Sequence, residues 1–292
     1  MIEVKNIHFW YPDGTNALCD VSLEIQDGEF IALIGQNGSG KTTFAKCIAG
    51  ILKPTKGEIL IDGKNLKNFR RKEIAEKIGY VFQNPDHQLF SNTCEKEISS
   101  GPRNLKLPLK EIKRRVEIAS EIAGVDRKLF NKHPFFLSKG LRQRVAIASI
   151  LSMQPKAIIV DEPTTGQDFK QSISVMEFLK KLNQQKHTIL IITHEMHIVA
   201  KYAKRVVLFK DGKILQDAST KEVFEKRDSL AKARVKPPQI TIFSRRVLNK
   251  TFLTCEEFLV KRKLEVRSQK LENPPLYSPL LKKGGNRGDY KN

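Results

Sequence analysis

The first candidate for chemistry is a glycine-rich segment, Gly35-Gln36-Asn37-Gly38-Ser39-Gly40-Lys41-Thr42, which has the spacing GxxxxGK[ST]. This is the spacing of a P-loop, whose glycines let backbone N–H groups curl around phosphate oxygens without obstruction by a Cβ atom. The segment follows an apolar run and precedes an expected helix, whose positive N-terminus faces the same anion. We expect Lys41 to reach the β- and γ-phosphates of a nucleotide, Thr42 to coordinate Mg²⁺, and Thr43 to lie beside them.

The second candidate is a pair of acids at the end of an apolar run, Ala157-Ile158-Ile159-Val160-Asp161-Glu162. We expect Asp161 to hold Mg²⁺, directly or through water, where the strand ends beside the P-loop. Glu162 is placed to accept a proton from an attacking water molecule. A strand that ends in two solvated acids is the alternative, but a P-loop 120 residues before Asp161 favours the catalytic interpretation.

A third group of residues gives the chain a family resemblance. Leu137-Ser138-Lys139-Gly140-Leu141-Arg142-Gln143-Arg144 resembles the signature of the ABC-type ATPases, usually Leu-Ser-Gly-Gly-Gln followed by basic and amide residues. Other family motifs are matched in the family's order by Tyr11 (the aromatic that stacks on adenine), Gln83 (the Q-loop), Thr165-Gly166-Gln167-Asp168 (the D-loop) and His194 (the switch histidine). Singly, His194 and Tyr11 would be read as ordinary residues; the order of all the motifs carries the resemblance.

The resemblance implies a mechanism with ATP and Mg²⁺ as cofactors. Two such domains face each other head to tail, and ATP lies between the P-loop of one and the Ser138 and Gly140 of the other. Glu162 polarises the attacking water, and His194 holds the water and the γ-phosphate in line. Gln83 senses the nucleotide and its Mg²⁺ and connects to a membrane partner. Asp168 contributes to the same nucleotide site.

A finer resemblance is to the ATPases of energy-coupling-factor importers, which take up vitamins, cobalt or nickel. It rests on Phe82-Gln83-Asn84-Pro85-Asp86-His87-Gln88-Leu89-Phe90, on Gly101-Pro102-Arg103-Asn104-Leu105, on Leu107-Pro108, on Glu162-Pro163-Thr164-Thr165-Gly166-Gln167-Asp168 and on Lys236-Pro237-Pro238-Gln239-Ile240. It implies a second ATPase subunit (homodimer or heterodimer), a transmembrane scaffold protein and a small substrate-binding membrane protein. The signature departs from the family at Lys139, where Gly is usual, and at Leu141, where Gln is usual.

Positioning these residues requires alternating strands and helices. The apolar runs at 30–34, 157–160, 188–192 and 205–209, separated by helical patterns, predict an α/β fold with a mostly parallel sheet, here of the P-loop ABC type. Alternating polar and apolar residues near the N-terminus predict an antiparallel β-subdomain. We expect an ATPase domain over 1–236, a helical insertion over about 84–153 whose last helix begins near Leu141, a small basic extension over 237–272 and a disordered tail over 273–292.

Composition narrows the function classes. The formal net charge is +20, and residues 225–292 supply half of the excess with 17 Lys+Arg against 7 Asp+Glu. Either an anionic partner or a basic surface that is simply solvated would explain this excess of positive charge. An ABC ATPase of another transporter class and a nucleic-acid-linked ABC ATPase are the alternatives. The coiled coil, zinc modules or second ATPase domain usual in the nucleic-acid-linked class are not evident, so nucleic acid is not an expected partner. A P-loop protein used as a switch is a third class, and Glu162 argues against it.

The expected location follows from hydropathy. No run approaches the roughly 20 apolar residues that span a bilayer, and the start Met1-Ile2-Glu3-Val4-Lys5 does not resemble a signal peptide. The four cysteines are far apart, which indicates reduced thiols rather than disulfides or zinc. These features predict a cytosolic chain, and the membrane partners that the resemblance implies would place it peripherally at the cytoplasmic face of the cell membrane.

Overall fold

The computed structural model describes residues 1–165 and 168–272, with side chains described up to residue 263. The predicted disordered tail over 273–292, and Gly166 and Gln167 of the D-loop, lie outside the described residues.

The N-terminal part forms a four-stranded antiparallel sheet in the order β2-β1-β4-β5. Its strands are β1 (Ile2–Trp10), β2 (Asn16–Ile25), β4 (Lys56–Ile61) and β5 (Lys64–Asn65). Because side chains alternate between the two faces of a strand, the apolar residues of β1 and β2 gather on one buried face. The antiparallel N-terminal subdomain is confirmed.

The central sheet has six strands in the order β10-β9-β3-β8-β7-β6. They are β3 (Phe30–Gly35), β6 (Ile78–Val81), β7 (Ala157–Asp161), β8 (Thr188–Ile192), β9 (Arg205–Lys210) and β10 (Lys213–Ser219). All neighbours pair in parallel except β9 and β10. The middle strands are buried on both faces, which explains their unbroken apolar runs.

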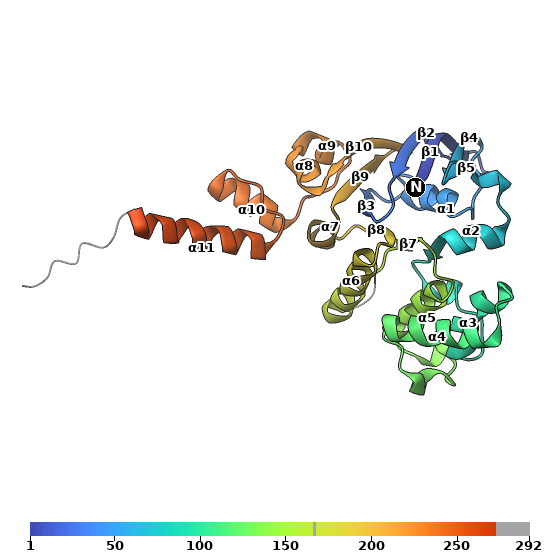
Figure 1. Ribbon diagram of the computed structural model, residues 1–292. Coiled ribbons are helices and arrows are strands. Elements are labelled where there is room, and N and C mark those ends of the chain that lie inside the picture. The colour runs from blue at the N-terminus through green and yellow to red at the C-terminus, as the bar shows by residue number, and fades with distance from the viewer. Residues whose placement is uncertain (166–167, 273–292) are drawn as a thin grey trace, which may run out of the picture.

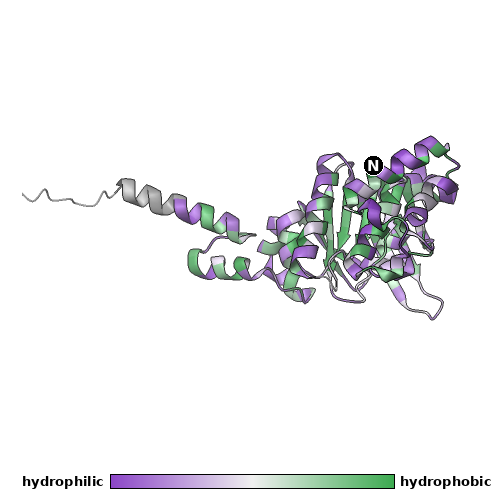
Figure 2. Ribbon diagram, turned by 90° about the horizontal axis from the view of Figure 1, so that it is seen from below, coloured by the Kyte–Doolittle hydropathy of each residue, from purple (hydrophilic) through white to green (hydrophobic). Residues whose placement is uncertain are grey.

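Helices cover both faces of the central sheet, whose apolar strands lie inside the molecule (Figure 2). In chain order they are α1 (Lys41–Ile48), α2 (Arg71–Lys77), α3 (Cys94–Asn104), α4 (Leu109–Ala123), α5 (Lys139–Leu151), α6 (Phe169–Gln184), α7 (Met196–Tyr202), α8 (Thr220–Glu225), α9 (Arg227–Lys232), α10 (Gln239–Leu248) and α11 (Cys255–Glu272). Helices α3, α4 and α5 pack together as a helical subdomain on one side of the sheet, and α10 and α11 extend away on the other (Figure 1). The domain boundaries at 236 and 272 stay predictions.

Strand β3 connects two hydrophobic cores. Its residues Ile31 and Leu33 face α1 and the antiparallel sheet, while Ala32 and Ile34 face the core built with α5 to α8. All four are inaccessible to solvent. Burial of this extent holds the end of β3, and therefore the loop that follows it, in one position.

The predicted site residues that follow or end strands gather at one edge of the central sheet. The P-loop follows β3, Asp161 ends β7, His194 follows β8 and Gln83 follows β6. These four strands are parallel, so their carboxyl ends meet at the same edge, which is where ligands bind in open α/β sheets. The edge of the sheet is thus where the sequence patterns converge.

Candidate nucleotide-binding site

The P-loop takes a conformation that requires glycine at two positions. Gly35 has φ 146° and Gly40 has φ 101°. A Cβ atom at Gly35 would collide with the Phe209 carbonyl oxygen, and one at Gly40 with that of Ala17. Both neighbours are backbone atoms that cannot move aside, so only glycine lets the loop pack this closely on β9 and β2.

Lys41 closes the P-loop from inside. Its Nζ donates to the carbonyl oxygens of Gly35 (2.9 Å) and Gln36 (2.7 Å) and, at 3.4 Å, to Ser39 Oγ. The side chain is buried, and burial lowers its pKa while the nearby charges of Glu162 and Asp161 raise it. An ammonium held by three neutral oxygens is ready to exchange them for phosphate oxygens, which carry full negative charge.

Thr42 and Asp161 form an oxygen-lined position beside the P-loop. Thr42 Oγ1 donates to Asp161 Oδ1 at 3.4 Å, and the Tyr80 hydroxyl donates to Asp161 Oδ2 at 2.8 Å. Burial raises the pKa of Asp161, opposed by these two hydrogen bonds and by the charges of Lys46 and Lys41. A hydroxyl and a carboxylate are ligands that Mg²⁺ prefers, and Mg²⁺ usually takes only a few protein ligands. The residues therefore fit the predicted metal.

Glu162 and His194 lie in contact on the same edge. His194 Nδ1 is 3.0 Å from both Glu162 Oε1 and Glu162 Oε2, and the Thr165 hydroxyl donates to Glu162 Oε2 at 3.2 Å. The Glu162 backbone has φ 51°, a left-handed conformation that is costly for a residue with a Cβ. Its N–H is held by the Ile192 carbonyl at 2.8 Å. The fold thus holds Glu162 in a strained position beside His194.

Tyr11 lies next to the P-loop helix. Its hydroxyl is 3.0 Å from Thr43 Oγ1, and its ring packs edge-on against Phe9. Gln83 is exposed, and the structure describes no hydrogen bond from its side chain. Gln36, Asn37 and Gly38 are exposed, and the described structure shows no hydrogen bond from their backbone N–H groups, which could therefore donate to a phosphate. The roles of Tyr11 and Gln83 stay predictions.

The signature residues lie on the helical subdomain, apart from the P-loop. Ser138 is the N-cap of α5 and its hydroxyl accepts from Leu141 N at 3.5 Å. Gly140 packs so closely on α6 that a Cβ atom would collide with the Gln171 side chain. In the described part of the chain no hydrogen bond joins Ser138 or Gly140 to the P-loop. A single chain therefore does not bring the two halves of the predicted ATP site together.

The start of α5 corrects one expectation. The helix begins at Lys139 rather than near Leu141, because the Ser138 hydroxyl caps it two residues earlier. Lys139 is therefore helical and does not have a positive φ, so a lysine at this position, where Gly is usual, causes no backbone strain. Leu141 is partly buried and packs on the hydrophobic core. Asp168, the described end of the D-loop, caps α6 by accepting from Gln171 N at 2.8 Å.

The contact between Tyr80 and Asp161 was not predicted from the sequence. The strand neighbour of Tyr80 in register is Ile159, two residues before Asp161. The hydroxyl is buried, and burial together with Asp161 raises its pKa. A tyrosine in a strand gives no sign of its partner until the pairing of β6 with β7 is known. A second missed contact is the short hydrogen bond from the Thr164 hydroxyl to Glu195.

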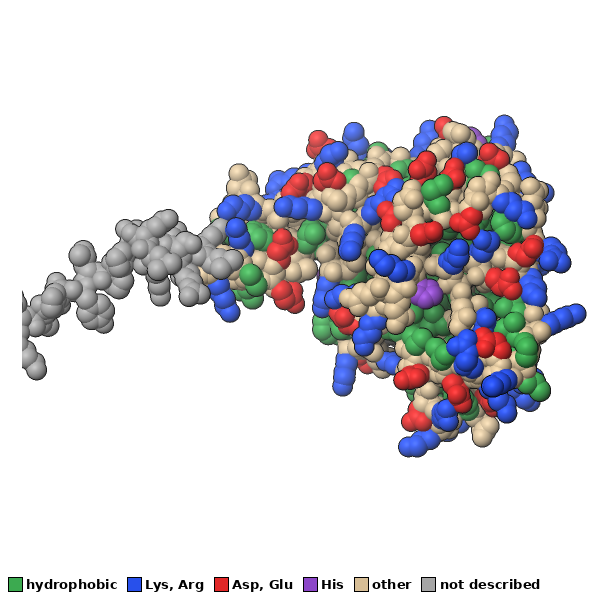
Figure 3. All heavy atoms as spheres, in the orientation of Figure 1, with side chains coloured by type: hydrophobic (Ala, Val, Ile, Leu, Met, Phe, Trp, Pro, Cys, Tyr) green, Lys and Arg blue, Asp and Glu red, His purple; other side chains and the backbone are tan. Residues whose placement is uncertain are grey.

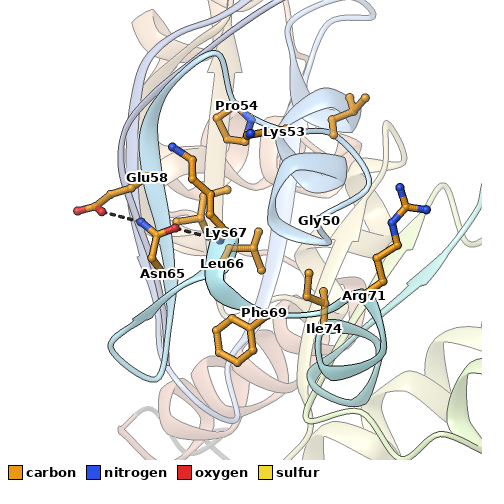
Figure 4. A pocket seen from close by; sticks show the side chains of 12 residues that line it. Gly50, Lys53, Pro54, Glu58, Asn65, Leu66, Lys67, Phe69, Arg71 and Ile74 are labelled. Carbon is orange, nitrogen blue, oxygen red and sulfur yellow. Dashed lines mark hydrogen bonds between the residues drawn. The ribbon is translucent and has the colours of Figure 1, made fainter. Parts of the chain in front are cut away.

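A separate pocket opens between α1, α2 and the antiparallel sheet (Figure 4). Its lining includes Lys53, Lys67 and Arg71, and Glu58, which accepts from Asn65 at 2.8 Å. It contains none of the predicted site residues.

A helix both long enough and apolar enough to cross a bilayer does not occur in the parts of the chain that the structure describes.

Comparisons with known proteins agree with this geometry. The family model described as ABC transporter matches residues 18–165. The chain is 42% identical to the energy-coupling factor transporter ATP-binding protein of Methanocaldococcus jannaschii, over 82% of this chain and 86% of that protein. It is 41% identical to a corresponding protein of Clostridium perfringens, over 88% and 93%. It is 48% identical to a relative from Caldanaerobacter subterraneus but spans only 45% of that longer protein.

Solved structures give the same result. The fold is similar to that of cbiO1 from Clostridium perfringens, described as part of the ABC transporter complex cbiONQ, with TM-score 0.70 and 38% identity over 82% of this chain and 96% of that one. It is also similar to a dimeric ATP-binding cassette in a post-hydrolysis state with ADP and Pi, with TM-score 0.68 and 31% identity over 75% and 99%. The chain therefore belongs to the ABC transporter family and is an ABC-type ATPase.

Proposed function

We propose that this chain is the ATP-hydrolysing subunit of an importer of the energy-coupling-factor type, located at the cytoplasmic face of the membrane. The observation that carries the proposal is the convergence of Lys41, Asp161, Glu162 and His194 at one sheet edge, with Ser138 and Gly140 outside it. The names of the relatives at 41% and 42% identity support the importer type. The imported substrate is a vitamin or a transition-metal ion, selected by a separate membrane protein.

Hydrolysis by these residues is mainly positioning and charge neutralisation. Lys41 leaves its loop oxygens for the β- and γ-phosphates, and the exposed loop amides hold the phosphate chain. Mg²⁺ held near Thr42 and Asp161 would neutralise charge on the phosphates. Both oxygens of Glu162 already have partners in His194 and Thr165. Glu162 becomes the base for water only when His194 turns toward the γ-phosphate.

A second ATPase subunit completes each site. The N-terminus of α5, with Ser138 as its cap, presents backbone N–H groups that suit a phosphate. Lys139 in the first turn adds a positive charge rather than strain. We infer a head-to-tail pair, which the dimeric cassette with ADP and Pi supports as a precedent. Gel filtration of the Glu162→Gln variant with and without Mg-ATP tests it, and a monomer under both conditions would contradict it.

An apolar groove offers a place for the membrane scaffold. It has a volume of about 370 Å³ and lies between the end of α1, α2, β6 and α5, with Ile51, Tyr80, Phe82 and Met153 in its lining. Ile51 is 46% exposed. A groove of this shape suits an amphipathic helix. Because Tyr80 lines it and also holds Asp161, movement of a bound helix would reach the metal position.

Co-purification with the scaffold tests the function as a whole. The wild-type chain should bind the scaffold, and the scaffold should raise its ATPase rate. Ile51→Asp should abolish both, whereas Leu215→Asp on exposed β10 should change neither. Identification of the small molecule that co-purifies with the intact complex would give the substrate. If Leu215→Asp impaired scaffold binding as much as Ile51→Asp does, the proposal that the scaffold binds in this groove would be wrong.

The charge distribution supports a transporter rather than a nucleic-acid partner. On the face shown in Figure 3, Lys and Arg side chains are interspersed with Asp and Glu over the ATPase domain instead of forming one basic stripe. Binding to nucleic acid would weaken steeply as salt increases. A salt titration of binding to duplex DNA is therefore the test, and tight, steeply salt-dependent binding would favour the rival class.

A further inference from the structure

A pocket at the start of the C-terminal extension lies outside the nucleotide site. It has a volume of about 420 Å³ and is formed by α9, the segment 233–238 and α10. Part of its lining is apolar and includes Leu230, Val235, Pro237 and Ile242. The other lining side chains are mostly cationic: Arg227, Arg234, Lys236, Arg245 and Arg246.

The cations of this basic pocket are not held in ion pairs by the described part of the chain. Its lining contains no carboxylate. Among the described residues, none of the five forms an ion pair within salt-bridge distance, and Arg245 donates only to the Thr251 hydroxyl, at 3.0 Å. Burial lowers the pKa of the half-buried Arg245, and the charge of Arg227 lowers it further; Glu225 opposes both. Like charges around one concave surface raise the local potential and concentrate anions there.

We propose that this basic pocket binds a phosphate group attached to an apolar moiety. Arginine forks match phosphate oxygens in bidentate pairs, and several cations that form no ion pair favour a group with more than one negative charge. The apolar part of the lining suits an organic part that a free inorganic ion lacks. A soluble phosphorylated compound and the headgroup of an anionic lipid share this chemistry. The proposal does not depend on ATP hydrolysis or on the importer type.

The first experiment uses pyrophosphate as a soluble probe, titrated calorimetrically into the full-length chain. The wild type should show two classes of sites, because the P-loop also binds phosphates. Lys41→Ala should remove one class. Arg227→Gln/Arg234→Gln should weaken the other by about tenfold or more while leaving the P-loop class unchanged. Neither side chain makes a hydrogen bond in the described structure, so the double variant should fold.

The second experiment uses vesicles. Full-length chain should co-sediment with phosphatidylglycerol vesicles more than with phosphatidylcholine vesicles, and the double variant should lose this preference if the source is a lipid. The matched control is Lys110→Gln/Lys113→Gln, which removes two exposed charges from α4.

The two probes separate the sources. If the pocket variant loses binding only to pyrophosphate, the natural ligand is a soluble compound. If it loses binding only to the anionic vesicles, the natural ligand is a lipid headgroup. If the pocket variant behaves like the wild type with both probes, or if the control loses as much as the pocket variant, the proposal is wrong and the cations are a solvated surface. A loss of ATPase activity alone would bear on the proposed function and not on this pocket.

Discussion

The hydrogen bond between Tyr80 and Asp161 gives the sharpest test of the site. Tyr80→Phe removes only the hydroxyl that donates to Asp161 Oδ2 at 2.8 Å and leaves the ring packed edge-on against Phe82. A hydrogen bond to a charged group contributes about 1.5–3 kcal/mol, which corresponds to about 10–100-fold in an equilibrium constant. Loss of a residue that orients a metal ligand typically costs about the same factor in metal affinity.

We therefore expect Tyr80→Phe to raise the Mg²⁺ concentration for half-maximal ATP binding and hydrolysis by about 10–100-fold. The assay is a Mg²⁺ titration at saturating ATP, read by a fluorescent nucleotide and by phosphate release. Tyr202→Phe is the control, because Tyr202 is also buried and donates to Glu177 at 2.8 Å, far from the metal position in the fold.

Stability alone does not separate these variants, since each removes the donor from one carboxylate oxygen, Asp161 Oδ2 or Glu177 Oε1. The Mg²⁺ concentration needed for half-maximal ATP binding and hydrolysis does separate them. An unchanged Mg²⁺ requirement in Tyr80→Phe, or an equal rise in Tyr202→Phe, would refute the argument that Tyr80 positions Asp161 for the metal.

Four further outcomes are expected. Glu162→Gln should keep ATP binding and nearly abolish steady-state phosphate release by the assembled complex; retained turnover would place the base elsewhere. Ser138→Ala and Gly140→Asp should lower the maximal ATPase rate far more than Lys139→Gly or Leu141→Gln, and the reverse order would mean that another subunit supplies the working signature. Removal of residues 241–292 should preserve ATP binding, checked by nucleotide titration, because the described nucleotide motifs all precede residue 195. Hydrogen bonds from Lys77 and the N-terminus lower the pKa of Asp62 to about 2 from 3.8. The contribution of Asp62 to stability is therefore fully present above pH 3.8 and is lost as the pH falls through about 2. Because the Asp62 side chain is 39% exposed, its contribution to the free energy of unfolding should be at most about 1 kcal/mol. Urea unfolding of Asp62→Asn should differ from the wild type at pH 6 and converge with it near pH 2.

The features that depend on neighbouring residues in the chain could be predicted without knowledge of the fold. The P-loop is local: glycines at 35 and 40, an apolar strand before them and a helix after them are all contiguous, so the pattern predicts the phosphate site directly. The strand that ends in Asp161 is local in the same sense, and alternation with helices was enough to predict a parallel sheet.

The residues that meet across the sheet could not be predicted from local patterns, because strand pairing sets these contacts. Asp161 acquires Thr42 from α1 and Tyr80 from β6, residues 119 and 81 positions away, because β6 pairs with β7 and α1 lies beside them. Glu162 likewise meets His194 only because β7 pairs with β8. The sequence also placed the start of α5 two residues late, since a side-chain cap is decided by the Ser138 geometry rather than by periodicity. The basic pocket depends on how α9 and α10 fold against each other, which charge counting over residues 225–292 could not show. Contacts between distant segments are set by strand pairing and packing, whereas the local patterns are set by backbone conformation and hydropathy.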